Sequence, residues 1–99
     1  LSRQAIEAFS SDFHPSKFRM SRISLTVHPD DNVSTLLDFH TDVLMTRDGL
    51  VLKEPIPFGH KVARQDIATG HAVIKYGVAI GKATTTIRAG EHVHVHNCS

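Results

Sequence analysis

A seven-residue pattern, Ile-x-x-Gly-x-x-Val, occurs three times after Lys53 and constrains the fold more than any other feature of the chain. The copies begin at Ile56, Ile67 and Ile87, so they follow one another at offsets of eleven and twenty residues. Each copy predicts an apolar anchor, a turn at a glycine that adopts positive φ without a Cβ clash, and a new strand with its valine on the core side. Short strands with glycine turns are typical of an all-β arrangement of bent hairpins, whereas the unequal offsets argue against a solenoid.

The residues before the repeats predict one strand and one short helix. Ile23, Leu25 and Val27 alternate with polar residues, which indicates a half-buried strand. Pro29 ends this strand because proline cannot donate to a strand ladder. From Val33, apolar residues return at the helical spacing i, i+3 and i+4, so a short helix is predicted over residues 33–39.

Three glycine-containing pairs predict tight turns. Asp48-Gly49 lies between the apolar triplets 43–45 and 50–52, which predicts a hairpin because this pair readily adopts positive φ. Tyr76-Gly77 and Ile80-Gly81 supply two further turn or bulge points between the second and third repeats.

Composition excludes several classes of protein. The 99 residues include eleven basic and ten acidic side chains, and the basic ones form no stripe with aromatic residues, so nucleic acid is not expected as a partner. No apolar run approaches the roughly 18–20 residues of a membrane span. The single cysteine, Cys98, cannot form an internal disulfide, which fits a reducing compartment, and a cytoplasmic location is expected.

The first twenty residues differ from the rest of the chain. Serines and a proline interrupt their short apolar pattern, and Met20-Ser21 resembles an authentic start. We therefore expect residues 1–20 to be a leader or upstream extension with little fixed structure, and residues 21–99 to form one domain.

A histidine ladder closes the chain. His92, His94 and His96 alternate with Val93 and Val95, which predicts an extended strand with the three imidazoles on one face. Neighbouring histidines would then have Cβ atoms about 6.5–7 Å apart, so one metal ion can be held by two of them but not by all three. The alternatives are a solvent-facing strip on an edge strand and adventitious metal capture by a His-x-His pair.

Several motifs, taken together and in order, resemble a known family. They are His28-x-x-Asp31-Asn32-Val33, Gly59-His60-Lys61, Lys75-Tyr76-Gly77 with Ile80-Gly81, and the closing segment 89–97. Over about residues 21–97 the chain resembles the N-terminal SAF-type domain of the altronate/galactarate dehydratase family. One departure concerns the closing segment, which is not histidine-rich in the galactarate branch of that family.

The resemblance implies a mainly β fold, the β-clip of SAF-like domains, here with short bent hairpins and one short helix. It also implies a parent enzyme that converts D-altronate to 2-dehydro-3-deoxy-D-gluconate and water with a divalent metal, Fe²⁺ or Mn²⁺. Such a reaction needs a base, stabilisation of the enediolate, and an acid on the departing hydroxyl. Parent proteins are several times longer, so the chain is expected to be a fragment that is inactive alone.

Candidate site residues come from the histidine-containing motifs, and no catalytic residue is assigned. The expected metal ligands are His28, His94 and His96. The expected substrate-binding residues are His60, Lys61 and Asn97. Asp31 and Asn32 are further candidates beside His28, although the same two residues would cap the predicted helix. For Lys61 the alternative is a solvated turn lysine.

The leading interpretation is a domain that binds a sugar acid and lines one wall of an active-site cleft. Its expected partners are that substrate and the C-terminal catalytic portion of the same parent chain, with no nucleic acid and no membrane, and an oligomer remains open. A different class of function is a non-catalytic SAF module that binds a carbohydrate or another protein. A third is a structural metal site organised by the histidine ladder.

Overall fold

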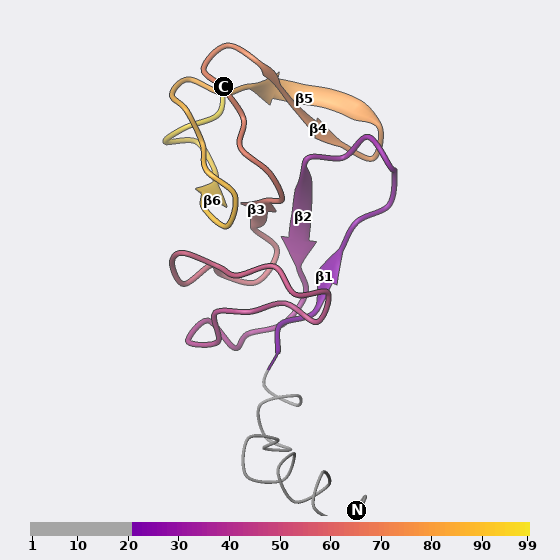
Figure 1. Cartoon of the computed structure of the whole chain (residues 1–99), viewed down its shortest axis with the longest axis vertical. Helices are drawn as coiled ribbons and strands as arrows, with labels where there is room; N and C mark the ends of the chain where they lie inside the picture. The colour runs from indigo at the N-terminus through magenta and orange to yellow at the C-terminus, as the bar shows by residue number, and fades with distance from the viewer. Residues whose placement is uncertain (1–20) are drawn as a thin grey trace, which may run out of the picture.

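The computed structural model describes residues 21–99, so the prediction of a leader over residues 1–20 lies outside the described residues. This part of the chain forms two antiparallel sheets of short strands and contains no helix (Figure 1). The first sheet has the order β1-β2-β3-β6, and β4 pairs with β5 in the second. The strands are β1 (Ser24–Leu25), β2 (Val33–Leu36), β3 (Lys61–Ala63), β4 (Ala72–Lys75), β5 (Val78–Lys82) and β6 (His92–Val93). The mainly β prediction is confirmed, and no helix among the described residues has the length and apolar character needed to cross a bilayer.

All three repeats form the same corner. In each copy the residue after the glycine donates its N–H to the carbonyl three residues earlier, from His60 to Pro57, from His71 to Ala68 and from Glu91 to Arg88. The three glycines have φ values of 81°, 86° and 89°, which is the backbone conformation that a type II turn requires at this position. The isoleucines and valines of all three copies are buried, and the strands β3, β4 and β6 start directly after the turns. The prediction of apolar anchor, glycine turn and new strand is therefore confirmed.

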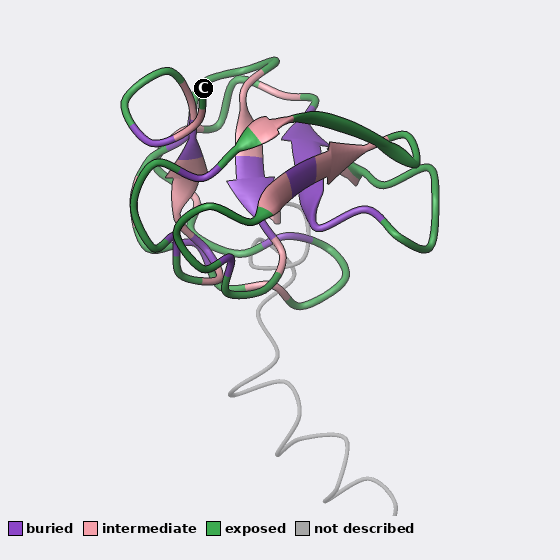
Figure 2. Ribbon diagram, turned by 90° about the horizontal axis from the view of Figure 1, so that it is seen from above, coloured by how far each residue is buried: buried purple, intermediate pink, exposed green. Residues whose placement is uncertain are grey.

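The short helix predicted over residues 33–39 is wrong, because this segment contains strand β2. Val33 packs in one apolar cluster with Ala63, whereas Leu36 packs in a second cluster with Val62. Successive residues of a strand point to opposite faces, so a strand buried on both faces carries apolar residues at spacings that imitate a helix. Figure 2 shows β2 buried along its whole length at the centre of the domain, while β5 is largely exposed at the periphery.

The strand predicted around residues 23–27 exists as β1, but its burial is the reverse of the expectation. Ile23, Leu25 and Val27 expose 38%, 40% and 58% of their surface. The buried side chain is Arg22, whose guanidinium donates to the Asp38 carboxylate at 2.5 Å and to a backbone carbonyl at 2.8 Å. A charged group is tolerated there because its donors are paired, which alternation of apolar residues cannot reveal.

The predicted turns are confirmed. Met45 and Val51 form an antiparallel bridge across the hairpin at Gly49, whose φ is 92°. Tyr76 and Gly77 both have positive φ, as expected for a two-residue turn, and connect β4 to β5. Farther along that pair, the register shifts by one residue next to Gly81, which is the predicted bulge.

Candidate metal centre

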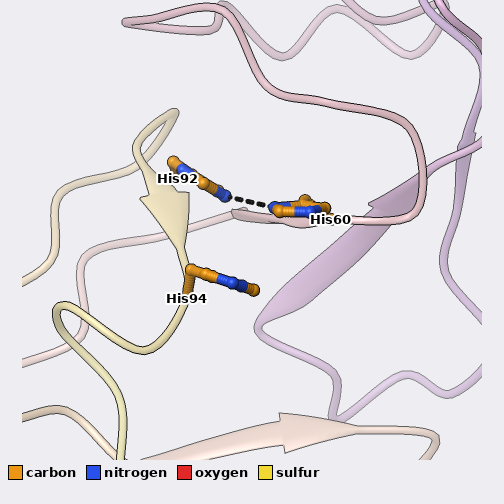
Figure 3. Close-up of side chains that lie close together, drawn as sticks. All are labelled: His60, His92 and His94. Atoms are coloured by element: carbon orange, nitrogen blue, oxygen red, sulfur yellow. Dashed lines mark hydrogen bonds between the residues drawn. The ribbon is translucent and has the colours of Figure 1, made fainter.

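The antiparallel pairing of β3 with β6 brings the first and third repeats together. Lys61 lies opposite Val93, and Val62 lies opposite His92. Continuing this register by one residue sets His60 opposite His94, where cross-strand neighbours have Cβ atoms about 4.5–5.5 Å apart. His60, which directly precedes β3, therefore meets His92 of β6 and His94, which directly follows β6, as Figure 3 shows.

The three imidazoles form a compact group, which we call the three-histidine cluster. One ring nitrogen from each residue lies within 4.8 Å of the others, and no other such group of potential ligands occurs among residues 21–99. His60 Nδ1 and His92 Nε2 are 2.9 Å apart, and the rings of His60 and His94 stack with centroids 4.4 Å apart. Two nitrogens bound to one ion lie at most about 4.2 Å apart, twice a typical metal–nitrogen distance. Small side-chain rotations would thus let all three bind the same ion.

The surroundings of His92 and His94 favour the neutral form of their imidazoles. Burial lowers the pKa of His92, the neighbouring His60 and His96 lower it further, and the nearby Glu54 only partly opposes them. The pKa of His94 is also lowered, first by burial and then by His60 and Lys61. A neutral imidazole has a free lone pair and is the form that binds metals. The lowered pKa values of His92 and His94 therefore favour the form of these two residues that can bind a metal.

The extended strand predicted over residues 92–96 is wrong beyond Val93. The Asn97 side chain accepts the N–H of His94 at 3.0 Å and donates to the carbonyl of His92 at 2.8 Å, which bends residues 94–97 into a turn. Val95 consequently leaves the core and is 82% exposed. The turn nevertheless keeps the imidazoles together, since the rings of His92 and His96 lie 5.4 Å apart.

A pocket of about 210 Å³ opens beside the three-histidine cluster. Its lining residues are Lys61, Ile80, His94, Val95, Cys98 and Ser99. Lys61 and His94, two of the predicted site residues, therefore face a common space. Asn97 is buried, and its side chain holds the turn in shape.

The structure places His28, Asp31 and Asn32 elsewhere, at the β4–β5 hairpin. The Asp31 carboxylate accepts the N–H of Gly77 at 2.7 Å, and the Asn32 side chain bonds to Ala72 and Ile74 of β4. Burial would raise the pKa of Asp31, but hydrogen bonds from Gly77 and three other backbone N–H groups lower it overall. The His28 ring covers Gly77 so closely that a Cβ there would lie 2.8 Å from it. These residues tie the hairpin to the start of β2, and His28 does not belong to the three-histidine cluster.

Sequence reasoning assigned His60 to substrate and did not include it among the metal ligands. The signal that could have found it is the repeat itself. The first and third copies each end in a strand, and pairing those strands antiparallel through Val62 and His92 sets His60 opposite His94.

Comparison with known proteins gives a family match and three relatives. Residues 22–99 match the family described as the altronate/galactarate dehydratase SAF domain. The alpha subunit of (2R)-sulfolactate sulfo-lyase from Chromohalobacter salexigens is 56% identical over 46 residues, which are 46% of this chain and 49% of that subunit. Altronate dehydratases of Escherichia coli and Bacillus subtilis are 43% and 38% identical over 76 residues, which are 74% of this chain and 15% of each enzyme. The chain thus spans about half of the first relative and a small part of the other two.

Proposed function

This chain belongs to the altronate/galactarate dehydratase SAF domain family, and we propose that it is the metal- and substrate-binding domain of a sugar-acid dehydratase. The proposed overall reaction converts D-altronate to 2-dehydro-3-deoxy-D-gluconate and water. The observation that carries the proposal is the three-histidine cluster beside a pocket that contains Lys61. The relatives named altronate dehydratase support the choice of substrate.

The donor set of the cluster fits a borderline divalent ion. Imidazole nitrogen suits iron, whereas manganese prefers oxygen ligands, so of the two expected metals we favour Fe²⁺. Three protein ligands leave positions open for substrate, as catalytic metal sites do. When bound, the ion supplies a Lewis acid for the substrate oxygens.

Residues of this chain would hold the substrate beside that ion. The Lys61 ammonium lines the same pocket as His94 and offers a point charge for the substrate carboxylate. The pocket volume of about 210 Å³ is below the roughly 300 Å³ at which ligand sites usually begin. We therefore propose that the domain provides one wall of the site and is inactive by itself.

A domain replacement tests this function. Residues 21–97 would replace the matching region of the Escherichia coli altronate dehydratase, and formation of the keto acid from altronate would be measured. We expect His60→Ala to lower kcat/KM by at least about 100-fold, in line with the loss of a metal ligand. His71→Ala is the matched control, because His71 holds the same position in the second repeat but lies outside the cluster. Equal effects of the two substitutions would refute the role of the cluster, and turnover at a full enzyme's rate by the 99-residue chain with Fe²⁺ would refute the single-wall role.

A second candidate function has its own observation. The matched segment of the sulfo-lyase subunit is more similar to this chain than the altronate dehydratases are, at 56% identity. Sulfolactate, like altronate, is a hydroxy acid, so the same imidazoles and Lys61 could serve a lyase that releases sulfite instead of water. Assaying the replaced region in both kinds of enzyme, for keto acid from altronate and for sulfite from (2R)-sulfolactate, separates the two candidates.

A further inference from the structure

Two of the residues that line the Lys61 pocket are exposed apolar side chains. Ile80 of β5 and Val95 of the closing turn line the pocket and expose 45% and 82% of their surface. We call Ile80 and Val95 the apolar rim. A hydroxyl-rich acid gains little from exposed apolar side chains, whereas apolar residues that lie together on the surface beside polar groups mark sites of protein interaction.

The closing turn holds the rim in a fixed position. The Asn97 side chain bonds to both His92 and His94, so the backbone that carries Val95 is constrained although its side chain is exposed. A side chain already ordered before binding loses little entropy when a partner covers it. Val95 is therefore better suited to contact a partner than a residue at the tip of a disordered loop would be.

The charge of the pocket indicates which side chains a partner would have to supply to complete the site. Lys61 lines the pocket, and none of the side chains that line it is a carboxylate. The three imidazoles are neutral ligands, so a divalent ion held by them keeps its full charge. A surface that supplies carboxylates at the centre and apolar side chains around them would complement this face.

We infer that the apolar rim is the docking surface for the catalytic portion of the dehydratase, and that this portion places acidic side chains over the Lys61 pocket. The inference rests on the proposed function. It adds which face of the domain contacts the catalytic portion and which charge that portion presents there. The apolar residues in and beside β1 are also exposed, by 38% to 58% of their surface. The pocket next to them is lined by the acidic Asp48 and by no histidine. That second surface therefore serves as the control.

Cys98 provides a direct reporter, because it is the only cysteine of the chain and lines the pocket under the rim. The 99-residue chain would be mixed with Escherichia coli altronate dehydratase from which the matching region has been deleted. Alkylation of Cys98 by N-ethylmaleimide would then be followed by mass spectrometry. We expect the rate to fall at least tenfold, and Ile80→Glu or Val95→Glu to restore it. In a Cys98→Ser, Val27→Cys variant, the new thiol two residues after β1 should react at the same rate with and without the enzyme.

Each other result overturns the inference. Unchanged alkylation of Cys98 excludes docking on the rim, and protection of the thiol at position 27 places the interface on the surface beside β1. Protection that grows with the concentration of the 99-residue chain alone identifies a second copy as the occupant. Alkylation needs no turnover, so this experiment can refute docking without refuting the proposed function. The proposed function is tested separately by the activities of the His60→Ala and His71→Ala variants.

Discussion

Two histidine-containing regions of this domain use their polar groups in opposite ways. At the β4–β5 hairpin, the side chains of Asp31 and Asn32 are buried and bonded to backbone groups of the hairpin. At the three-histidine cluster, only one hydrogen bond joins the rings, His60 to His92, and His94 faces a pocket. Both regions carry family motifs. In the first, the polar side chains form hydrogen bonds that stabilise the fold, whereas in the second the ring nitrogens are available to bind a ligand.

This contrast gives a physical test for a motif residue. A buried polar side chain whose partners are all backbone groups stabilises the fold, because removing it leaves those groups unpaired. A partly exposed imidazole with a lowered pKa and few partners can give up its present contacts for a metal ion at little cost. We therefore expect Asn32 to stabilise the fold and His94 to serve as a ligand.

The largest expected effect is on metal affinity. Replacing both His92 and His94 by alanine should weaken Co²⁺ binding, measured by visible absorption, by more than about 100-fold, because two of three ligands are lost. The free energy of unfolding without metal should change by less than about 1 kcal/mol, since both side chains are partly exposed. Affinity that survives in the double variant would remove the cluster as the metal site.

The complementary change should affect stability and leave the metal site intact. Asn32→Ala removes hydrogen bonds to Ala72 and Ile74 and leaves buried backbone groups unpaired, so we expect a loss of about 2 kcal/mol in urea denaturation. The folded variant should bind Co²⁺ with unchanged affinity. A weaker site in a variant of normal stability would contradict the separation of the two regions.

The smallest expected effect is the pH dependence of stability without metal. The pKa values of His92 and His94 lie below the ordinary value of 6.5, so the unfolded chain binds more protons than the folded one near that pH. Stability should therefore fall as the pH decreases from about 7 through 6.5, and level off below the folded pKa values. Comparing the chain with its double alanine variant by thermal denaturation isolates this contribution, and identical pH profiles would show that the imidazoles are not perturbed.

Prediction from sequence succeeded where the physics is local. The repeats were found because a glycine at positive φ and two buried apolar residues mark each corner, and neither depends on distant partners. The helix over residues 33–39 was wrong because burial on both faces of β2 is a property of the assembled sheet. The extended strand through His96 was wrong because one side chain, Asn97, competes for the backbone hydrogen bonds of that segment.

The candidate site residues also differ in whether the sequence alone could identify them. Lys61 and His94 were predicted as site residues, and the structure brings both to one pocket. Their roles in substrate and metal binding stay predictions, as does a metal-binding role for His28, which the structure places against Gly77. The place of His60 in the cluster could not be predicted, because it depends on the pairing of β3 with β6, which lie about thirty residues apart in the chain.

The sequence by itself determined a mainly β chain with glycine corners, a family, and a supply of imidazoles near its end. It could do so because turn conformations and motif residues are encoded within a few neighbouring positions. Only the tertiary structure decided which imidazoles meet, because that depends on the register between β3 and β6, and which polar motif residues are already bonded. Those long-range contacts separate the residues that hold this fold together from those left free to bind a ligand.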